Sequence, residues 1–439
     1  MGEFLLDHKQ ILVIFSFTFI FFSFLLYKNV SFINSHQDID SKAYLNNAIT
    51  FHKYNNFVQS GQALDIPYYS MGYAFFIGIL YKIFGINNWV LIFVQILLAL
   101  LTGFLIFRIA NYLFDKNTAI ISFILFSINL GFLVFSQFIL TEILLSFFLV
   151  LFLERFVLFL RTNLILYLIE SAFCLGLSIA IKPAALYFIF FIILFLLVFA
   201  KNRIKSVIIF SLFFYLPILG YMSFNKITYN QFVVGALGNE NLYFYFLPKV
   251  LACKNNSSIK KELLHIQSLL NGNKLESKSW KKINQLWMQT LKQNPFLCFK
   301  IWLLNVLKTF LGLFTTNLKV LVEPTTKGGD VSFFKTKGDF LCRIMTYISA
   351  GTCSCIVRVV GFFELVWNVL RYLFCLIAFG SLILNKRWEV FFLLSFFIFY
   401  FAFITGHDGC ARFRMMFEFI LIILAARGII ISWKISKGS

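Results

Sequence analysis

The sequence predicts an all-α polytopic membrane protein, and two observations carry this prediction. Hydrophobic residues make up 60% of the 439 positions and charged residues only 13%, with a mean hydropathy of +0.84. Soluble domains are closer to half apolar. The apolar residues are also grouped into runs of roughly 17 to 25, the length that an α-helix needs to cross a bilayer.

These runs predict about eleven to thirteen spans. They lie near residues 11–27, 68–84, 89–113, 117–135, 137–160, 164–181, 183–200, 205–223, 298–316, 363–384, 388–405 and 414–433, with a less regular run near 340–360. The first run is long, and no small-residue cleavage site follows it before Asp38. We therefore interpret it as a membrane helix and not as a signal peptide.

Two polar regions separate the apolar runs, at residues 28–66 and 224–297. Within the second, apolar residues recur at helical spacing among Lys and Gln at 259–270 and 283–291. This pattern predicts amphipathic helices that lie on the membrane or cap a site. The predicted domains are an N-terminal transmembrane module (1–223, including the loop 28–66), an extracytoplasmic amphipathic-helix region (224–297) and a C-terminal transmembrane region (298–439).

Basic residues between the runs predict the sidedness, because cytoplasmic loops are enriched in Lys and Arg. Five clusters are Arg108 with Lys116, Arg155 with Arg161, Lys201 with Arg203 and Lys205, Lys386 with Arg387, and Lys434 with Lys437. If all are cytoplasmic, the opposite face holds Asp40, Glu142, Lys182, Arg412 and Arg414. Three apolar runs separate Asp40 from Glu142, so one of them should not span. We expect the short run 68–84 to be re-entrant or juxtamembrane.

The net charge of +20 does not indicate a nucleic-acid partner here. In a soluble protein such a charge would favour nucleic acid, but these basic residues lie between apolar runs. The eight cysteines are scattered and show neither zinc-site spacing nor a disulfide framework. Membrane lipids are the surroundings that the composition predicts.

The first candidate site is the stretch after the first helix, where Asp38 and Asp40 would emerge near the membrane surface. Carboxylates there can face both a lipid-borne substrate and water. Two residues apart on a helix, they point in different directions, whereas Tyr44 lies on the same face as Asp40. The alternative is a solvated acidic start that caps a helix at 41–52.

Four further charged residues stand at ends of apolar runs, where a charge at membrane depth is costly. Glu142 either begins a helix, with Thr141 as its cap, or faces the site. Lys182 before Pro183 is either a snorkelling lysine or a cation for phosphate. Arg412 and Arg414 stand at the start of the last predicted helix, where positive charge opposes the helix dipole, and an anionic ligand would explain both.

Metal binding stays open at this point. His36, His52, His265 and His407 with Asp408 could supply ligands, yet their spacing matches no known metal site. We therefore predict no metal-ligating residues and no certain cofactor, with a divalent ion as the alternative.

Several short motifs, in this order, resemble the GT-C glycosyltransferases. They are Asp40-Ser41-x-x-Tyr44-x-x-x-Ala48, Gly72-Tyr73, Phe84-Gly85, Gln95, Thr141-Glu142, Lys182-Pro183, Asn294-Pro295, Ala411-Arg412-Phe413-Arg414 and Ala425-Ala426-Arg427-Gly428. The chain looks most like the bacterial branch related to protein O-mannosyltransferases and the aminoarabinose transferase of lipid A. It departs from them at 69–73, where relatives carry a Pro-Gly-Tyr-Pro type turn, and at Lys182, where Arg is common.

The resemblance implies a GT-C-like helical bundle in the bacterial inner membrane with an extracytoplasmic active site. It implies an inverting transfer of a sugar, hexose or pentose, from a polyprenyl (undecaprenyl-type) phosphate to a lipid, glycan or protein of the cell envelope. Asp40, or failing it Asp38, would be the catalytic base. The substrate-binding residues would be Tyr44, Glu142, Lys182, Arg412 and Arg414, the last three cations stabilising the departing phosphate.

Other functions are compatible with the same pattern. A transporter or flippase would also be polytopic, although it more often shows paired repeats, and none is evident here. A polysaccharide polymerase or ligase using the same lipid carrier differs only in its substrate, and a relative without activity could keep the fold.

Overall fold

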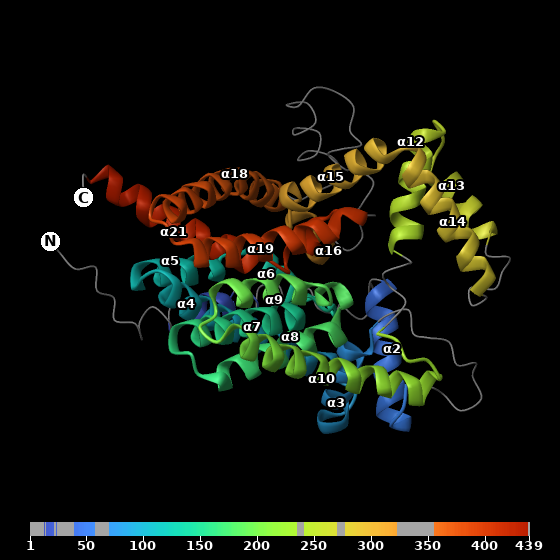
Figure 1. Ribbon diagram of the computed structural model, residues 1–439, viewed down its shortest axis with the longest axis horizontal. Coiled ribbons are helices and arrows are strands. Elements are labelled where there is room, and N and C mark those ends of the chain that lie inside the picture. Colours follow the sequence, from blue (N-terminus) through green and yellow to red (C-terminus); the bar gives the residue numbers. More distant parts are fainter. Residues whose placement is uncertain are drawn as a thin grey trace.

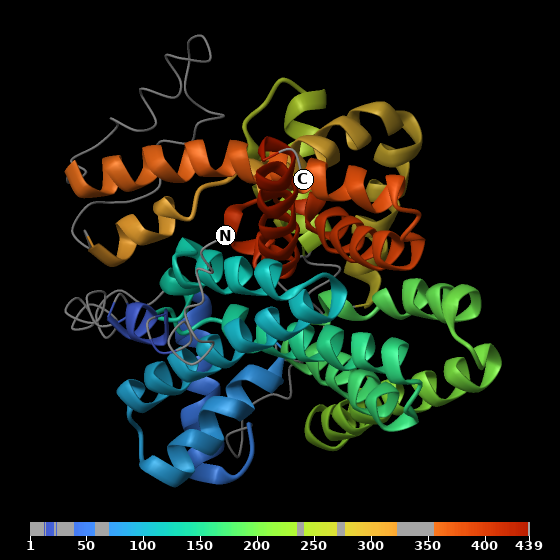
Figure 2. The same cartoon turned by 90° about the vertical axis from the view of Figure 1, so that its left-hand side faces the viewer.

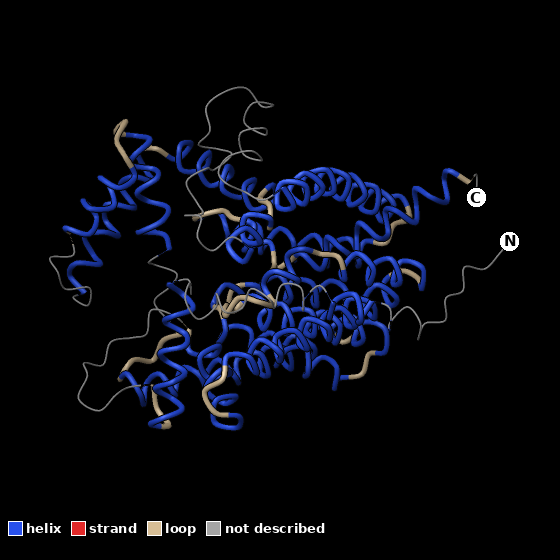
Figure 3. The backbone as a smooth tube through the Cα atoms, turned by 180° about the vertical axis from the view of Figure 1, so that it is seen from behind, coloured by secondary structure: helices blue, strands red, loops and turns tan. Residues whose placement is uncertain are grey.

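The computed structural model describes residues 13, 15–21, 23, 39–57, 70–234, 241–269, 277–322 and 355–437. All regular elements in these ranges are helical (Figure 3), which confirms the all-α class. The N-terminal helices are α2 (Ile39–Tyr54), α3 (Met71–Phe84), α4 (Asn88–Leu113), α5 (Lys116–Ser127), α6 (Leu130–Phe135), α7 (Glu142–Thr162), α8 (Ile165–Ile181), α9 (Phe188–Phe199) and α10 (Arg203–Tyr229). The later helices are α12 (Leu247–Lys254), α13 (Ile259–Ser268), α14 (Ser277–Gln293), α15 (Pro295–Leu311), α16 (Thr315–Val322), α18 (Cys355–Leu384), α19 (Trp388–Ile404), α20 (Ala411–Arg414) and α21 (Glu418–Ser436).

The helices form two packed groups. In Figure 1, α15, α16, α18, α19 and α21 lie above the group from α2 to α10, and α12 to α14 stand at one end. The turned view of Figure 2 shows the same two groups, blue to green below and orange to red above. Side chains join them: the Tyr400 hydroxyl donates to the Ala184 carbonyl at 2.6 Å, and the Ser146 hydroxyl donates to the Met415 carbonyl at 3.0 Å.

Six described helices are long and apolar enough to cross a membrane: α4, α7, α10, most of α18, the stretch Trp388–His407 and α21. The bent pair Pro295–Leu311 and Thr315–Leu321 would make a seventh span. The chain is therefore a multi-pass membrane protein. The number is below eleven because four further apolar helices have only 10 to 17 residues. Part of the first run and most of the run near 340–360 lie outside the described residues.

The short helices include α3, as expected for the run at 68–84, but also α5, α8 and Pro183–Phe199, which were predicted to span. A polar side chain and a proline explain two of the breaks. The Asn129 side chain accepts a hydrogen bond from the Phe132 N–H and so begins α6, splitting the run predicted at 117–135. Pro183 has no N–H to continue α8, so α8 ends before Lys182.

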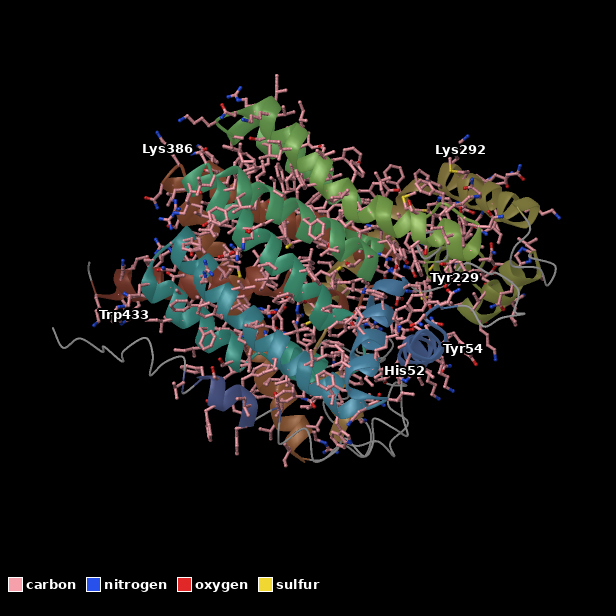
Figure 4. All side chains as sticks on the ribbon, turned by 90° about the horizontal axis from the view of Figure 1, so that it is seen from below. His52, Tyr54, Tyr229, Lys292, Lys386 and Trp433 are labelled. Carbon is pink, nitrogen blue, oxygen red and sulfur yellow. The ribbon has the colours of Figure 1, made fainter. Side chains whose placement is uncertain are left out.

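Some of the basic residues predicted to share one side, among them Arg108, Lys386 and Arg387, lie toward one end of the bundle. Figure 4 shows Lys386 and Trp433 at the end opposite His52, Tyr54 and Tyr229. Arg387 donates to the Leu113 carbonyl at 2.6 Å, and Arg427 pairs with Asp115 at 2.6 Å. Arg108 pairs with Glu154 at 2.9 Å. This agrees with the distribution expected for loops on one side of a membrane.

The two predicted amphipathic helices are present as α13 and α14. Ile266 and Ile283 are both fully buried, in a small core with Tyr243, Leu247 and Leu251. Their apolar faces therefore pack against each other and α12. A second apolar cluster, Phe246, Val250, Cys298 and Ile301, attaches α12 to α15.

Gly428 allows α21 to touch the backbone of α18, since a Cβ at 428 would lie 2.1 Å from the Phe374 carbonyl oxygen. We expect Gly428→Ala to lower the free energy of unfolding by about 1–3 kcal/mol because the helices would be forced apart. The control is Gly380→Ala in α18, where an added Cβ meets nothing within 4 Å and helix propensity improves. Thermal unfolding in one detergent compares them, and equal midpoints would contradict the close contact.

Candidate functional site

Arg412 joins the two carboxylates that the sequence predicted to share one face. Its Nε lies 2.6 Å from Glu142 Oε1, and its Nη1 lies 2.8 Å from Asp40 Oδ2. The three residues come from α20, α7 and α2, which are far apart in the sequence. Glu142 is only 2% exposed, whereas the Arg412 and Asp40 side chains are 19% and 29% exposed. A ligand can therefore reach Asp40 and Arg412 more easily than Glu142.

Lys182 adds a second cation to this group. Its Nζ lies 3.4 Å from Glu142 Oε1 and 5.0 Å from the centre of the Phe413 ring. It stands between α8 and the turn Pro183–Ala185, and 22% of its side chain is exposed. Lys182 is therefore paired with Glu142 and not simply extended into water. Thr141 makes no side-chain cap on α7. The buried position of the Glu142 carboxylate is therefore explained by its pairing with two cations and by its place at the start of a helix.

Tyr44 completes the group on α2. Its ring packs edge-on to Tyr73 at 5.0 Å, and the Tyr73 hydroxyl donates to Gln95 Oε1 at 2.5 Å. Burial raises the pKa of Tyr44 well above its ordinary value, and the nearby Glu142 and Asp40 carboxylates add to the shift while Arg412 opposes it. Tyr44 therefore stays protonated and can act as a hydrogen-bond donor.

The segment 405–414, which carries Arg412, lies directly on α15. Asn305 Nδ2 donates to the Gly406 carbonyl at 2.9 Å. Gly409 has a φ of +68°, and a Cβ there would lie 2.2 Å from the Asn305 carbonyl oxygen. Gly312 meets Ala411 in the same way, at 2.8 Å from its nitrogen. Glycines at these positions permit an approach that any side chain would prevent, and this fixes the backbone that presents Arg412.

Arg414, also predicted to bind substrate, lies apart from this group and makes a different set of contacts. It is fully buried; its Nε lies 2.7 Å from Glu418 Oε2, and its Nη1 donates to the Phe310 and Gly312 carbonyls at 2.7 and 2.8 Å. Arg371 pairs with the same Glu418 at 2.5 Å. The last long helix begins only at Glu418, four residues after Arg414, so the dipole argument for an anionic ligand does not apply to Arg414.

Asp38, the second candidate base, lies outside the described residues. A bound divalent ion stays an untested alternative for this site. In the described ranges no group of three or more His, Cys, Asp or Glu could hold an ion. The carboxylates Asp40 and Glu142 already bind Arg412 at short distance, so a metal ion between them would have to displace the guanidinium.

The second carboxylate oxygen of Glu142, Oε2, is buried without a hydrogen-bond partner. It can accept a hydrogen bond from a bound molecule.

Sequence reasoning missed Lys249 as a residue of this region. Lys249 of α12 pairs with Asp408, 159 positions away, at 2.5 Å. Asp408 follows His407, whose ring lies 5.3 Å from that of Phe413. His407 and Asp408 were considered only as metal ligands. A lysine in a lysine-rich polar region gives no signal for so distant a contact.

Comparisons with known proteins agree with the resemblance seen in the sequence. Residues 69–223 match the family described as dolichyl-phosphate-mannose-protein mannosyltransferase, and this segment contains Glu142 and Lys182. No curated protein matches the chain. The oligosaccharyltransferase of Archaeoglobus fulgidus in its apo form has a similar structure, with a TM-score of 0.50, 14% identity and coverage of 97% of this chain and 50% of that one.

The same Archaeoglobus fulgidus enzyme tethered to an acceptor peptide gives a TM-score of 0.50 at 12% identity, again covering 97% of this chain and 50% of that one. The chain thus spans about half the length of the solved proteins it matches. At this identity the likeness shows the fold, and together with the matched segment it confirms the GT-C resemblance.

Proposed function

We propose that this chain is an inverting membrane glycosyltransferase that uses a polyprenyl phosphate-linked sugar as donor. The observation that carries the proposal is the group of Asp40, Glu142, Lys182 and Arg412, joined in one chain of ion pairs. Two of these residues lie in the segment that matches a mannosyltransferase family. The acceptor would be a lipid, glycan or protein of the cell envelope, on the extracytoplasmic face of a bacterial inner membrane.

The residues have the chemical types that such a transfer requires. The acceptor hydroxyl oxygen attacks the anomeric carbon, the bond from that carbon to the phosphate oxygen breaks, and the phosphate departs with the electron pair. Asp40 takes the proton of the acceptor hydroxyl as general base. A phosphate leaves as a stable anion, so no general acid is needed, unlike in glycosidases with two catalytic carboxyl groups.

Exposure supports Asp40, and not Glu142, as the base. Glu142 is 2% exposed and Asp40 is 29% exposed, so only Asp40 is open to an incoming acceptor. Glu142 would orient the sugar or the acceptor through its buried Oε2, and Tyr44 would donate a hydrogen bond. Lys182 and Arg412 would stabilise the negative charge that develops on the phosphate.

Replacing Asp40 by Asn is expected to reduce sugar transfer by about 10²–10³-fold, because the amide cannot take the proton. The assay uses liposomes with the purified protein, a panel of radiolabelled polyprenyl phosphate sugars and a crude cell-envelope acceptor. Asp115→Asn is the matched control, since Asp115 lies at the opposite end and caps α5 through an oxygen that Asn retains.

Equal sugar transfer by wild type and Asp40→Asn would contradict the assignment of Asp40 as the general base. Movement of the labelled lipid across the liposome membrane without transfer would favour a flippase instead. Transfer of whole glycan chains and not of single sugars would favour a polymerase or ligase.

A further inference from the structure

We propose that Lys249 is a third cation for the phosphate of the lipid-linked donor, supplied by the region of α12 to α14. This inference rests on the proposed function and adds a residue that the sequence did not indicate. With Arg414 committed to buried carbonyls and Glu418, only Lys182 and Arg412 remain of the three cations predicted to bind phosphate. Lys249 would take the third place.

The position of Lys249 supports this role. Its Nζ lies 2.5 Å from Asp408 Oδ1 and 3.3 Å from the Asp408 carbonyl oxygen. The neighbouring His407 interacts electrostatically with both Lys249 and Lys182. The His407 ring packs beside Phe413, and the Lys182 ammonium lies 5.0 Å from the centre of the same Phe413 ring. Lys249 and Lys182 thus approach one small region from different helices.

Charge balance explains why a further cation is needed. A lipid-linked sugar phosphate is a diester with one negative charge, and the departing lipid phosphate is a monoester that gains up to one more. In the described site, Glu142 and Asp40 already balance Lys182 and Arg412. The additional charge therefore requires a cation whose present partner can be exchanged.

The Lys249–Asp408 pair can exchange more easily than the two pairs that Glu142 makes with Lys182 and Arg412. The Lys249 and Asp408 side chains are 21% and 36% exposed, whereas Glu142 is 2% exposed. An ion pair at the surface contributes little net stability, because water solvates each partner after separation. A buried carboxylate left without its cation is costly. Lys249 can therefore move from Asp408 to phosphate without leaving an unsolvated charge.

The simpler explanation is that this pair only holds the outer helices to the segment 405–414. Apolar contacts already hold these helices to α15, on which the segment 405–414 lies. Phe246 and Val250 are buried against Cys298 and Ile301, and the Phe246 ring lies 5.1 Å from that of Trp302 on α15. The outer helices therefore stay attached without the ion pair.

The two explanations predict opposite effects of Asp408→Asn on the affinity for a lipid phosphate, so a binding measurement distinguishes them. The probe is undecaprenyl phosphate, with dolichyl phosphate in parallel, titrated into purified full-length protein in nanodiscs. Lys249→Gln is expected to raise the dissociation constant about tenfold, the equivalent of one charge-assisted hydrogen bond. Lys249→Arg should restore most of the affinity. Asp408→Asn is expected to lower the dissociation constant, because it releases Lys249.

If the pair were only a structural link, Lys249→Gln and Asp408→Asn would weaken binding alike. That result, or unchanged binding in Lys249→Gln, would overturn the inference. The matched control is Lys254→Gln, at the last position of the same helix, where Nζ contacts Gln293 at 3.1 Å; its dissociation constant should equal that of wild type.

The same titration distinguishes this inference from the proposed function. Wild type that binds neither lipid phosphate and transfers no sugar would refute the function and the inference together. Wild type that binds and transfers, with Lys249→Gln doing both equally well, would refute the inference alone. If Lys249 contacts the donor phosphate, Lys249→Gln should also lower kcat for sugar transfer more than it raises KM. The reason is that the additional negative charge develops on the phosphate in the transition state.

Discussion

Replacing Arg412 by Gln is expected to lower kcat/KM for sugar transfer about 10⁴-fold, the largest catalytic loss in this protein. The loss combines the stabilisation of phosphate charge with the placement of the base. Arg412 is the residue that touches both Asp40 and Glu142, at 2.8 and 2.6 Å. Without its guanidinium, the two carboxylates would face each other with only Lys182 near Glu142. Radiolabel transfer at varied donor concentration measures the effect.

Arg412→Lys is the informative second variant. A lysine keeps the charge but cannot reach two carboxylates with a rigid fork, so we expect an activity between those of wild type and Arg412→Gln. Arg161→Gln, an exposed arginine at the far end of α7, serves as the control and should transfer normally. Normal transfer by Arg412→Gln would refute the role of the ion-pair chain and leave Lys182 as the principal phosphate ligand.

Replacing Arg414 by Met is expected to destabilise the fold by about 3–5 kcal/mol, the cost of leaving buried charged partners without their cation. Glu418 would lose one of its two arginines, and the Phe310 and Gly312 carbonyls would lose a donor. Thermal unfolding followed by size-exclusion chromatography in detergent measures this loss. A normal melting midpoint with weakened binding of lipid phosphate would contradict a purely structural role for Arg414 and would support its role in substrate binding.

Arg161→Met provides the matched control for Arg414→Met, because the same change at an exposed position leaves no buried charge behind. Its midpoint should stay close to that of wild type. The two arginines of one short helix thus differ in kind: Arg412 is expected to affect transfer, and Arg414 is expected to affect stability.

The fold class and most helix positions could be predicted from the sequence, because apolar runs of bilayer length have few alternatives. The breaks within these runs were harder to predict. Asn129 ends one of them because its side chain caps α6 and its Nδ2 donates to Glu418, 289 residues away. A single polar residue in an apolar run does not reveal such a distant partner.

The site could be predicted in part, because charges at the ends of apolar runs are costly without a partner. This cost indicated Glu142, Lys182 and Arg412. The structure brings these three residues together with Asp40 and Tyr44. The predicted substrate-binding role of Arg414 did not take into account Glu418, four residues later, with which Arg414 forms a local pair. Lys249 could not be found, because only the tertiary structure brings α12 to Asp408.

The shortness of α8 has a consequence for the surrounding lipids. Its 17 residues span about 26 Å, less than the roughly 30 Å of a hydrocarbon core. Short apolar helices are accommodated by local thinning of the bilayer, and Lys182 stands at the end of this one. If α8 crosses the bilayer, we therefore expect the leaflet near its Lys182 end to be thinner than the bulk leaflet. We then expect shorter acyl chains to bring a lipid phosphate closer to this lysine.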